Sequence, residues 1–512
     1  MTTRRQFLKG TSAAIAGSGI ALPFGLTGAF ASGAPASLSI AVPSDVPSWD
    51  PIARIEPGPI SIYRAVFSQP LDYAADNTLG GGVVQNWEWL DDSGMNLKLT
   101  LRDDVLFHNG DRMTSADIRF TFLERVQADP GLALGWIWFT IGDIETPDET
   151  TAIFRFKMPM VTAPAFLGYL GAYILPKTYF ETVGAEGFLE KPVGSGPYML
   201  AEYERDSRIV LKAFPDYFRG KPAIETVTFS VVKDPTTRAA LIQSNQSDLS
   251  TALSVRDVAR LGALDGITGQ VDPTVDLYML HMVNTGPWQD KNLRLAAHHA
   301  IDKAAISRAF FQGKVEPLST PQGPGTPAYR PDFDFAFDTA KAQALMAELG
   351  YGPENPVKVT FHCTRGVYPS DYDIARAITQ MWAKVGIEAD LRVLTVAEYH
   401  NRSNKELEGP MLWLWSNATA DPQLNSGYFL DPNSAFSVWK SADVGEKIAP
   451  LLGETDVAKR IEGFGAFNVW AVEQGYTVPL FQGAVALAYS SGLAFTPYLN
   501  GWLSPAEYRW NG

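Results

Sequence analysis

The residues of this chain that could do chemistry are spaced in ways that argue against catalysis. His298 and His299 are adjacent, so on a helix their side chains would point about 100° apart and would not share a metal ion. Cys363 is the only cysteine and has no obvious base near it in the sequence, so we expect a half-buried residue rather than a nucleophile. Residues 194–196, G-S-G, lack the G-x-S-x-G pattern of a hydrolase and are typical of a tight turn. We therefore expect no catalytic site, no metal site and no cofactor.

A different kind of chemistry is indicated by residues 413–422, W-L-W-S-N-A-T-A-D-P. Trp413 and Trp415 have the same parity, so in a strand both side chains would lie on one face. Small uncharged residues follow, and the first charge is Asp421. Flat aromatic faces without a nearby charge suit an apolar or weakly polar group that stacks on them. The segment predicts one wall of a ligand-binding cleft, with packing in the core as the alternative for each tryptophan.

Strands and helices that would position these residues alternate along the chain. Apolar side chains recur at every second position in residues 38–42, 96–101 and 151–156, which predicts strands. In residues 374–385 they recur at helical spacing, and Gly386 would end that helix. This interleaving indicates an α/β fold.

The first 31 residues are predicted to be an export signal that is not part of the fold. Arg4 and Arg5 precede an uncharged run over residues 10–30, which ends in a small-x-small cleavage site at residues 29–31. Paired arginines before such a run are typical of twin-arginine signals. We expect export to the periplasm in the folded state. No cysteine lies at the end of the signal, so we expect a soluble protein without a lipid anchor.

The net charge and the composition of the chain exclude some classes of binding partner. The chain has 512 residues and a net charge of −14, which becomes −17 when Arg4, Arg5 and Lys9 leave with the signal. An acidic balance of this size argues against nucleic acid as a partner. A single cysteine allows no intrachain disulfide. No second apolar run is long enough to span a membrane. We expect a freely diffusing monomer.

Seven segments of the sequence carry a resemblance to one family. In chain order they are G-V-V-Q-N-W-E-W with Trp87, L-R-D-D-V-L-F-H-N-G-D (101–111), T-S-A-D-I (114–118), G-S-G-P-Y (194–198), R-G-K-P (219–222), Arg294 with A-I-D (300–302), and W-A-K-V-G-I (382–387). In this order they resemble the extracytoplasmic solute-binding proteins of ABC importers, the peptide, opine and nickel type called family 5. The resemblance covers nearly the whole mature chain.

The resemblance implies a type II, cluster C-like periplasmic binding protein fold, with two α/β lobes, a hinge and an extra domain. Lobe I would comprise residues 38–72, 189–284 and 478–512, the extra domain residues 73–188, and lobe II residues 285–477. A ligand would lie between the lobes, and a permease in the inner membrane would read their closure. No bond is made or broken in such a mechanism, so the protein is expected not to be an enzyme.

Two loops bear on the ligand. T-R-G-V-Y-P, residues 364–369, is similar to a loop of dipeptide-binding relatives whose arginine pairs with the ligand carboxylate, and Arg365 takes that place. Residues 415–422 resemble the pattern W-x-x-D-x-x-D-P, but the aspartate that binds the peptide ammonium falls on Ala418. A buried ammonium without a partner anion is costly. The departure argues against an ordinary peptide, unless an acid elsewhere replaces the missing aspartate.

The sequence thus predicts a solute-binding component of an ABC importer for a small peptide-like or carboxylate-bearing solute, such as an opine-type conjugate. An oligosaccharide is the alternative that the tryptophans favour, and a nickel chelate is a weaker one. An exported enzyme or a chaperone-like peptide sink is the alternative from a different class. The predicted ligand-binding residues are Arg365, Tyr368, Trp413, Trp415, Asn417, Ala418 and Thr419.

Overall fold

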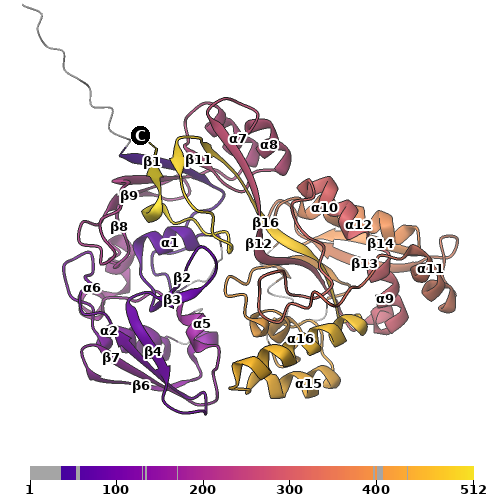
Figure 1. Cartoon of the computed structure of the whole chain (residues 1–512), viewed down its shortest axis with the longest axis horizontal. Helices are drawn as coiled ribbons and strands as arrows, with labels where there is room; N and C mark the ends of the chain where they lie inside the picture. The colour runs from indigo at the N-terminus through magenta and orange to yellow at the C-terminus, as the bar shows by residue number, and fades with distance from the viewer. Residues whose placement is uncertain are drawn as a thin grey trace, which may run out of the picture.

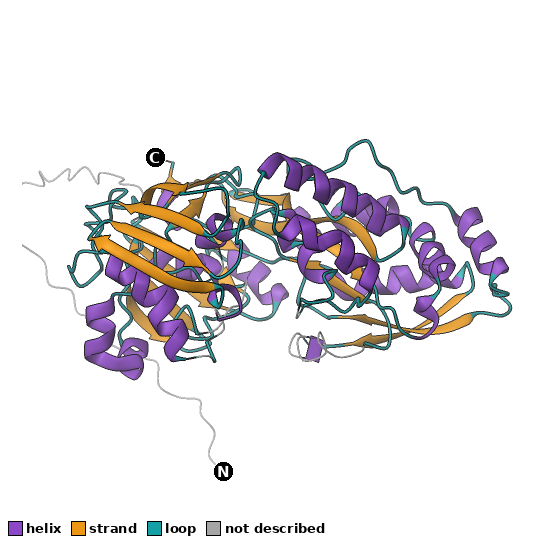
Figure 2. Ribbon diagram, turned by 90° about the horizontal axis from the view of Figure 1, so that it is seen from below, coloured by secondary structure: helices purple, strands orange, loops and turns teal. Residues whose placement is uncertain are grey.

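The computed structural model describes residues 36–511 apart from 54–57, 130, 133–134, 170, 396–397, 400–406 and 435. The predicted export signal, residues 1–31, lies outside the described residues. The described residues form two halves that lie side by side in both views (Figures 1 and 2). One half contains the early part of the chain and the other the later part (Figure 1).

A ten-stranded sheet runs through both halves. Its strand order is β14-β13-β15-β12-β16-β11-β1-β10-β9-β8. In the first half, which we call lobe I, β1 pairs in parallel with β10, and the side chains of both strands alternate between more and less buried positions along most of their length. The elements of this half are β1 (Ser37–Val42), α1 (Ile60–Val66), β8 (Tyr198–Glu204), β9 (Arg208–Ala213), β10 (Thr226–Val231), α7 (Pro235–Gln243), β11 (Leu249–Ser250) and α8 (Val255–Leu261).

A separate four-stranded sheet packs against these strands, and in describing the structure we count it as part of the lobe I half. Its order is β4-β5-β7-β6, and its buried side chains join the same hydrophobic core as those of β1 and β10. The capping box expected at Thr114 and Asp117 is present at the start of α2. The elements are β2 (Leu71–Tyr73), β3 (Leu79–Gly81), β4 (Val84–Trp89), β5 (Asn96–Leu101), α2 (Ser115–Arg119), a π-helix (Phe120–Glu124), α3 (Arg125–Ala128), α4 (Gly135–Trp138), β6 (Ile141–Asp148), β7 (Thr151–Phe156), α5 (Ala163–Leu167) and α6 (Lys177–Glu190).

The second half, which we call lobe II, has its own core around β13, β14 and β15. The predicted helix over residues 374–385 is α12, which begins earlier and ends at Ala383. Gly386 follows at a positive φ of 93°. The elements are α9 (Lys291–His299), α10 (Lys303–Phe311), α11 (Thr339–Glu348), β13 (Val357–Cys363), α12 (Asp371–Ala383), β14 (Ile387–Val393), β15 (Met411–Trp415), α14 (Ser426–Phe429), α15 (Ala442–Leu452) and α16 (Val457–Glu473), with short 3₁₀ helices at Gly286–Gln289 and Pro422–Leu424.

Two long strands, β12 (Ile267–His281) and β16 (Thr477–Ser490), connect the lobes (Figure 1). They pair antiparallel along their length, but the register shifts between Pro273 and Leu277. The four steps along β12 from Pro273 to Leu277 face only two steps along β16, from Ala484 to Gln482, so Thr274 to Asp276 form a bulge. A bulge bends its strand and can redirect a side chain. This one lies where β12 passes from one lobe to the other. The chain ends in lobe I with β17 (Leu493–Ala494), a 3₁₀ helix (Pro505–Glu507) and β18 (Arg509–Trp510).

Candidate ligand-binding site

Three of the resemblance segments meet inside lobe I. A Cβ on Gly194 would lie 2.1 Å from the carbonyl oxygen of Val66, so only glycine fits there. The backbone amide of His108 donates to the carbonyl of Gly194 at 2.8 Å, and its Nε2 lies 3.0 Å from the carbonyl oxygen of Gly196. Burial lowers the pKa of His108 to about 4, so the ring is neutral at pH 7. These residues fix the backbone of lobe I.

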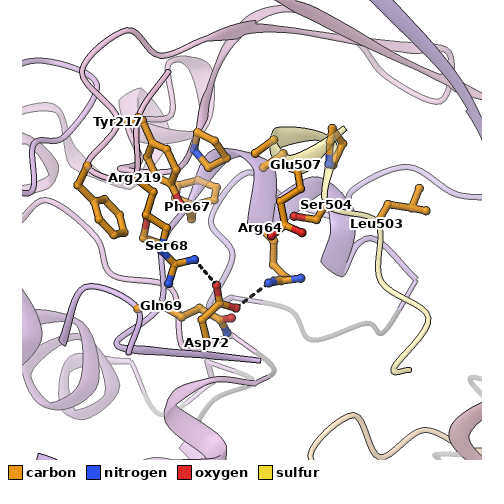
Figure 3. Close-up of a pocket in the computed structure, with 17 residues that line it drawn as sticks. Arg64, Phe67, Ser68, Gln69, Asp72, Tyr217, Arg219, Leu503, Ser504 and Glu507 are labelled. Atoms are coloured by element: carbon orange, nitrogen blue, oxygen red, sulfur yellow. Dashed lines mark hydrogen bonds and ion pairs between the residues drawn. The ribbon is translucent and has the colours of Figure 1, made fainter. Parts of the chain in front are cut away.

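The same region contains a small polar cavity of about 150 Å³. Figure 3 shows Asp72 in it between two arginines, at 2.6 Å from Arg64 and 2.9 Å from Arg219. Burial alone would raise the pKa of Asp72, but the two cations lower it below its ordinary value. The residues that line the cavity lie between 64 and 82, 197 and 220, and 503 and 507. None of them belongs to lobe II, so this cavity is not the space between the lobes.

Arg365 lies on an exposed loop that a buried carboxylate holds in shape. Asp371, only 3% exposed at the start of α12, accepts a hydrogen bond from the hydroxyl of Thr364 at 2.7 Å. It also accepts from the backbone amide of Gly366 at 2.9 Å and from the next two amides along the chain. The Arg365 guanidinium lies 3.6 Å from the ring centre of Tyr372. Within the described residues it forms no ion pair, so its charge is free to meet an anion.

Sequence reasoning missed the part played by Asp371. The available signal was an acidic residue in the first turn of a predicted helix, directly after the loop.

The two tryptophans of β15 have different surroundings. Trp413 is 6% exposed, stacks on Tyr399 at 4.1 Å between ring centres, and meets the edge of Tyr368 at 5.3 Å. Trp415 is partly exposed, and its indole nitrogen donates to the carbonyl of Leu424 at 2.5 Å. Both rings therefore belong to an aromatic cluster of lobe II, and Trp415 keeps more of its surface open. Tyr368 connects this cluster to the loop of Arg365.

The loop after β15 is stiffened by its own side chains. Asn417 is buried, and its side-chain amide donates to the carbonyl of Asp421 at 2.9 Å. The hydroxyl of Thr419 donates to Asn417 Oδ1 at 2.6 Å and accepts from the amide of Asp421 at 3.1 Å. Ala420 has a positive φ of 56°. Asn417 and Thr419 thus hold the loop in one conformation, with the backbone of Ser416 to Ala418 presented to lobe I.

This loop closes the space between the lobes. Ala418 is 1% exposed, and the phenol of Tyr169 donates to the carbonyl of Ser416 at 3.4 Å. Further along, the rings of Phe166 and Tyr428 lie 6.4 Å apart. The two lobes are therefore in contact, and we call this arrangement closed. The side chains of lobe I that surround Ala418 are apolar or aromatic: Ile60, Tyr73, Tyr169, Tyr498 and Trp502.

Two acids lie beside this loop in different states. Asp421 forms a two-pronged ion pair with the buried Arg460, at 2.6 and 2.9 Å. Asp276, from the bulge of β12, accepts from the backbone amide of Asn417 at 3.1 Å. Burial raises the pKa of Asp276 to about 6. Within the described residues no cation pairs with Asp276.

A pocket of about 510 Å³ lies between the lobes on the Thr419 side of the loop. Lobe I contributes Asn77 and Leu499 to it, lobe II contributes Lys314 and Thr419, and the connecting strand β16 contributes Gln482. The cleft thus retains open space next to the loop even with the lobes in contact.

The cysteine is placed differently from what its sequence suggested, whereas the histidines lie on one helix as expected. The rings of His298 and His299 both stack on Phe335, at 3.7 and 4.2 Å between ring centres. Cys363 is fully buried rather than half-buried, and burial raises its pKa to about 12. No group of three residues able to hold a metal occurs in the described part of the chain.

Two α/β lobes joined by a pair of long strands, with polar and aromatic loops of lobe II facing lobe I, define a two-lobed solute-binding protein. The family model described as "Bacterial extracellular solute-binding proteins, family 5 Middle" matches residues 78–437. The chain belongs to this family, and its function is to bind a solute outside the cytoplasm.

Individual relatives are more distant and differ in what their names say they bind. The dipeptide-binding protein of Escherichia coli K12 is 27% identical over 413 residues, which cover 74% of this chain and 76% of that protein. Heme-binding protein A of Haemophilus influenzae is 24% identical over 492 residues, which cover 87% and 86%. The structure of MoaA from A. tumefaciens R10 in complex with mannopinic acid is 22% identical, covers 94% of this chain and all of that one, and has a TM-score of 0.79.

These comparisons confirm the predicted fold class and family. The oligosaccharide alternative finds no support in them, since the relatives named here bind a peptide, heme or an opine acid. The helices in the described part of the chain include none that is long and apolar enough to cross a bilayer.

Proposed function

We propose that this protein is the periplasmic solute-binding component of an ABC importer. It captures a small peptide-like or carboxylate-bearing solute, such as an opine-type conjugate, and delivers it to a permease in the inner membrane. The observation that carries the ligand class is Arg365. Its guanidinium is exposed on a loop that Asp371 holds rigid, and a planar guanidinium suits two parallel hydrogen bonds to a carboxylate.

In this proposal the permease recognises the closed arrangement of the two lobes. The loop of residues 416–421 already bridges the lobes through Tyr169 and Ala418, so a solute next to it would touch both lobes only in the closed state. A ligand shifts an equilibrium only through contacts that differ between the two states. The names of the relatives, which mention a dipeptide and mannopinic acid, support a solute that carries a carboxylate.

The domain organisation and the route of export belong to the same proposal. Lobe I comprises residues 38–72, 189–284 and 478–512, the extra domain residues 73–188, and lobe II residues 285–477. Residues 1–31 direct the chain to the twin-arginine pathway, and the mature protein works as a monomer without a cofactor, without nucleic acid and without catalysis. The relatives are named as binding proteins, which supports this last point.

A thermal-shift screen of residues 32–512 tests the ligand class. Short peptides, opine acids, oligosaccharides and metal chelates are each added at increasing concentration. A ligand at a hundredfold excess over its Kd should stabilise the folded protein by about 2.7 kcal/mol, a shift of a few degrees. Shifts confined to carboxylate-bearing compounds are expected. A shift with neutral sugars alone would contradict the proposal, and conversion of any bound compound into a product would contradict the absence of catalysis.

A further inference from the structure

Asp276 lies at the point where the two lobes are joined. It is the last residue of the bulge in β12, directly before the pairing with β15 and β16 resumes at Leu277. Opposite it on β16 stands Gly483, and a Cβ there would lie 2.9 Å from the Cβ of Asp276. Because Gly483 carries no side chain, the facing strand leaves room for the side chain of Asp276. Asp276 is partly buried, and its carboxylate lies against the loop of residues 416–421, which contacts Tyr169 of the other half.

Among the described residues, the surroundings of Asp276 contain hydrogen-bond donors but no positive charge. The carboxylate accepts from the backbone amide of Asn417 at 3.1 Å and from the side chain of Ser416. The titratable groups near it are phenols, those of Tyr169 from the lobe I side, Tyr368 from the Arg365 loop, and Tyr278 from its own strand. Phenols at neutral pH do not neutralise a carboxylate. In the described residues Asp276 is thus an acid in the cleft without a cationic partner.

Three other carboxylates of the described residues, those of Asp421, Asp371 and Asp72, are already engaged. Asp421 is neutralised by Arg460 through two hydrogen bonds. Asp371 accepts four hydrogen bonds from its own loop and holds it in shape. Asp72 lies in lobe I between two arginines. Of these four carboxylates only Asp276 remains available for a positively charged group of a ligand.

Asp276 also lies beside the loop in which this chain has Ala418 where the family pattern has an aspartate. Ala418 follows directly on Asn417, the residue whose amide Asp276 binds, and it carries no charge. Its side chain is enclosed by aromatic groups of lobe I. A ligand cation beside this loop would therefore meet the carboxylate of β12 instead of one from the loop itself.

We propose that Asp276 is the binding residue for a cationic group of the solute, so that the solute carries an ammonium or guanidinium group in addition to its carboxylate. This inference rests on the proposed function and narrows its ligand class. Because Asp276 belongs to the strand that joins the lobes, the ligand's positive charge is recognised where closure takes place. Arg365 and Asp276 then receive opposite charges of the same zwitterionic solute.

Isothermal titration calorimetry with matched compounds tests the inference. The probes are the dipeptide Ala-Phe, its N-acetylated form and mannopinic acid. The proteins are the mature wild type, Asp276→Asn and Asp272→Asn. Asp272 is also on β12 and is partly buried, but it accepts from Gln270 and lies before the bulge, so its variant is the matched control. Thermal unfolding without ligand checks that each variant is folded.

The wild type and Asp272→Asn should bind a compound with a free amine at least tenfold more tightly than Asp276→Asn does. N-acetylation should weaken wild-type binding by at least tenfold and leave Asp276→Asn unaffected. Equal binding of the free and acetylated peptide by the wild type, or unchanged affinity in Asp276→Asn, would overturn the inference and leave the proposed function standing. Binding of none of the three compounds would overturn the proposed ligand class and this inference with it.

Discussion

Asp276 should make the closure of the empty protein depend on pH. In the closed structure burial raises the pKa of this carboxyl to about 6. Opening the lobes would withdraw Tyr169 and admit water, which would return the pKa towards the ordinary value of about 3.9. A group with a higher pKa in the closed state favours closure when it is protonated. The empty closed state is therefore most stable at low pH and loses stability, relative to the open state, as the pH rises through 6.

The size of the effect follows from the two pKa values. A difference of about two units, at 1.36 kcal/mol per unit, corresponds to about 2.7 kcal/mol, or roughly 100-fold in the ratio of closed to open molecules. This is an upper figure, because Asp276 is partly exposed. About half of it, roughly tenfold, falls between pH 5 and pH 7.5. At neutral pH the empty cleft thus resists closure, and a ligand cation beside Asp276 would remove the penalty.

Small-angle X-ray scattering of the ligand-free protein measures this directly. The radius of gyration of the wild type should be larger at pH 7.5 than at pH 5, because more molecules are open. Asp276→Asn should show little change, since an amide cannot ionise, and Asp272→Asn should behave like the wild type. An identical pH response of wild type and Asp276→Asn would show that other groups govern closure and would refute the reasoning.

Three further predictions concern the loops of lobe II. Arg365→Ala should weaken a carboxylate-bearing ligand by about 2–4 kcal/mol in calorimetry, while Arg376→Ala, an exposed arginine of α12, should not; a change within twofold would exclude Arg365 as the anchor. Asp371→Asn removes the charge that organises the Arg365 loop, so it should lower the free energy of unfolding in urea by about 1–3 kcal/mol and weaken ligand binding through Arg365. Unchanged stability together with unchanged ligand affinity would contradict the role of Asp371 in holding this loop. Asp421→Asn leaves the buried Arg460 without its anion and should destabilise the protein by about 3–5 kcal/mol in the same assay; unchanged stability would mean that this ion pair is not needed.

The fold could be predicted from the sequence because its determinants are local or carried by motifs. The strands at 96–101 and 151–156 appear with the predicted bounds, since each has one buried face and alternates strictly. The glycines of residues 194–198 are required by contact with Val66, and Arg294 donates to three backbone carbonyls in lobe II. Residues of this kind shape the lobes, and they identify the family without identifying its solute.

The candidate site was harder to predict, because its members are brought together by tertiary structure. The loop residues 413–419 stand out by composition, but the burial of Trp413 under Tyr399 depends on a contact that no periodicity reveals. Asp276 lies 141 positions before Asn417 in the sequence. Its orientation comes from a register shift between two strands, and a single sequence gives no sign of such a bulge.

One physical explanation covers both the alanine at position 418, where the family pattern has an aspartate, and the carboxylate at position 276. Ala418 is enclosed by Tyr73, Tyr169 and other apolar groups of lobe I, where an aspartate would be buried without a cation whenever the cleft closed empty. On the strand that joins the lobes, the same charge accepts a hydrogen bond from the amide of Asn417. Moving the acid from the loop to the strand therefore preserves an anchor for a positive charge and lets apolar contacts hold the lobes together.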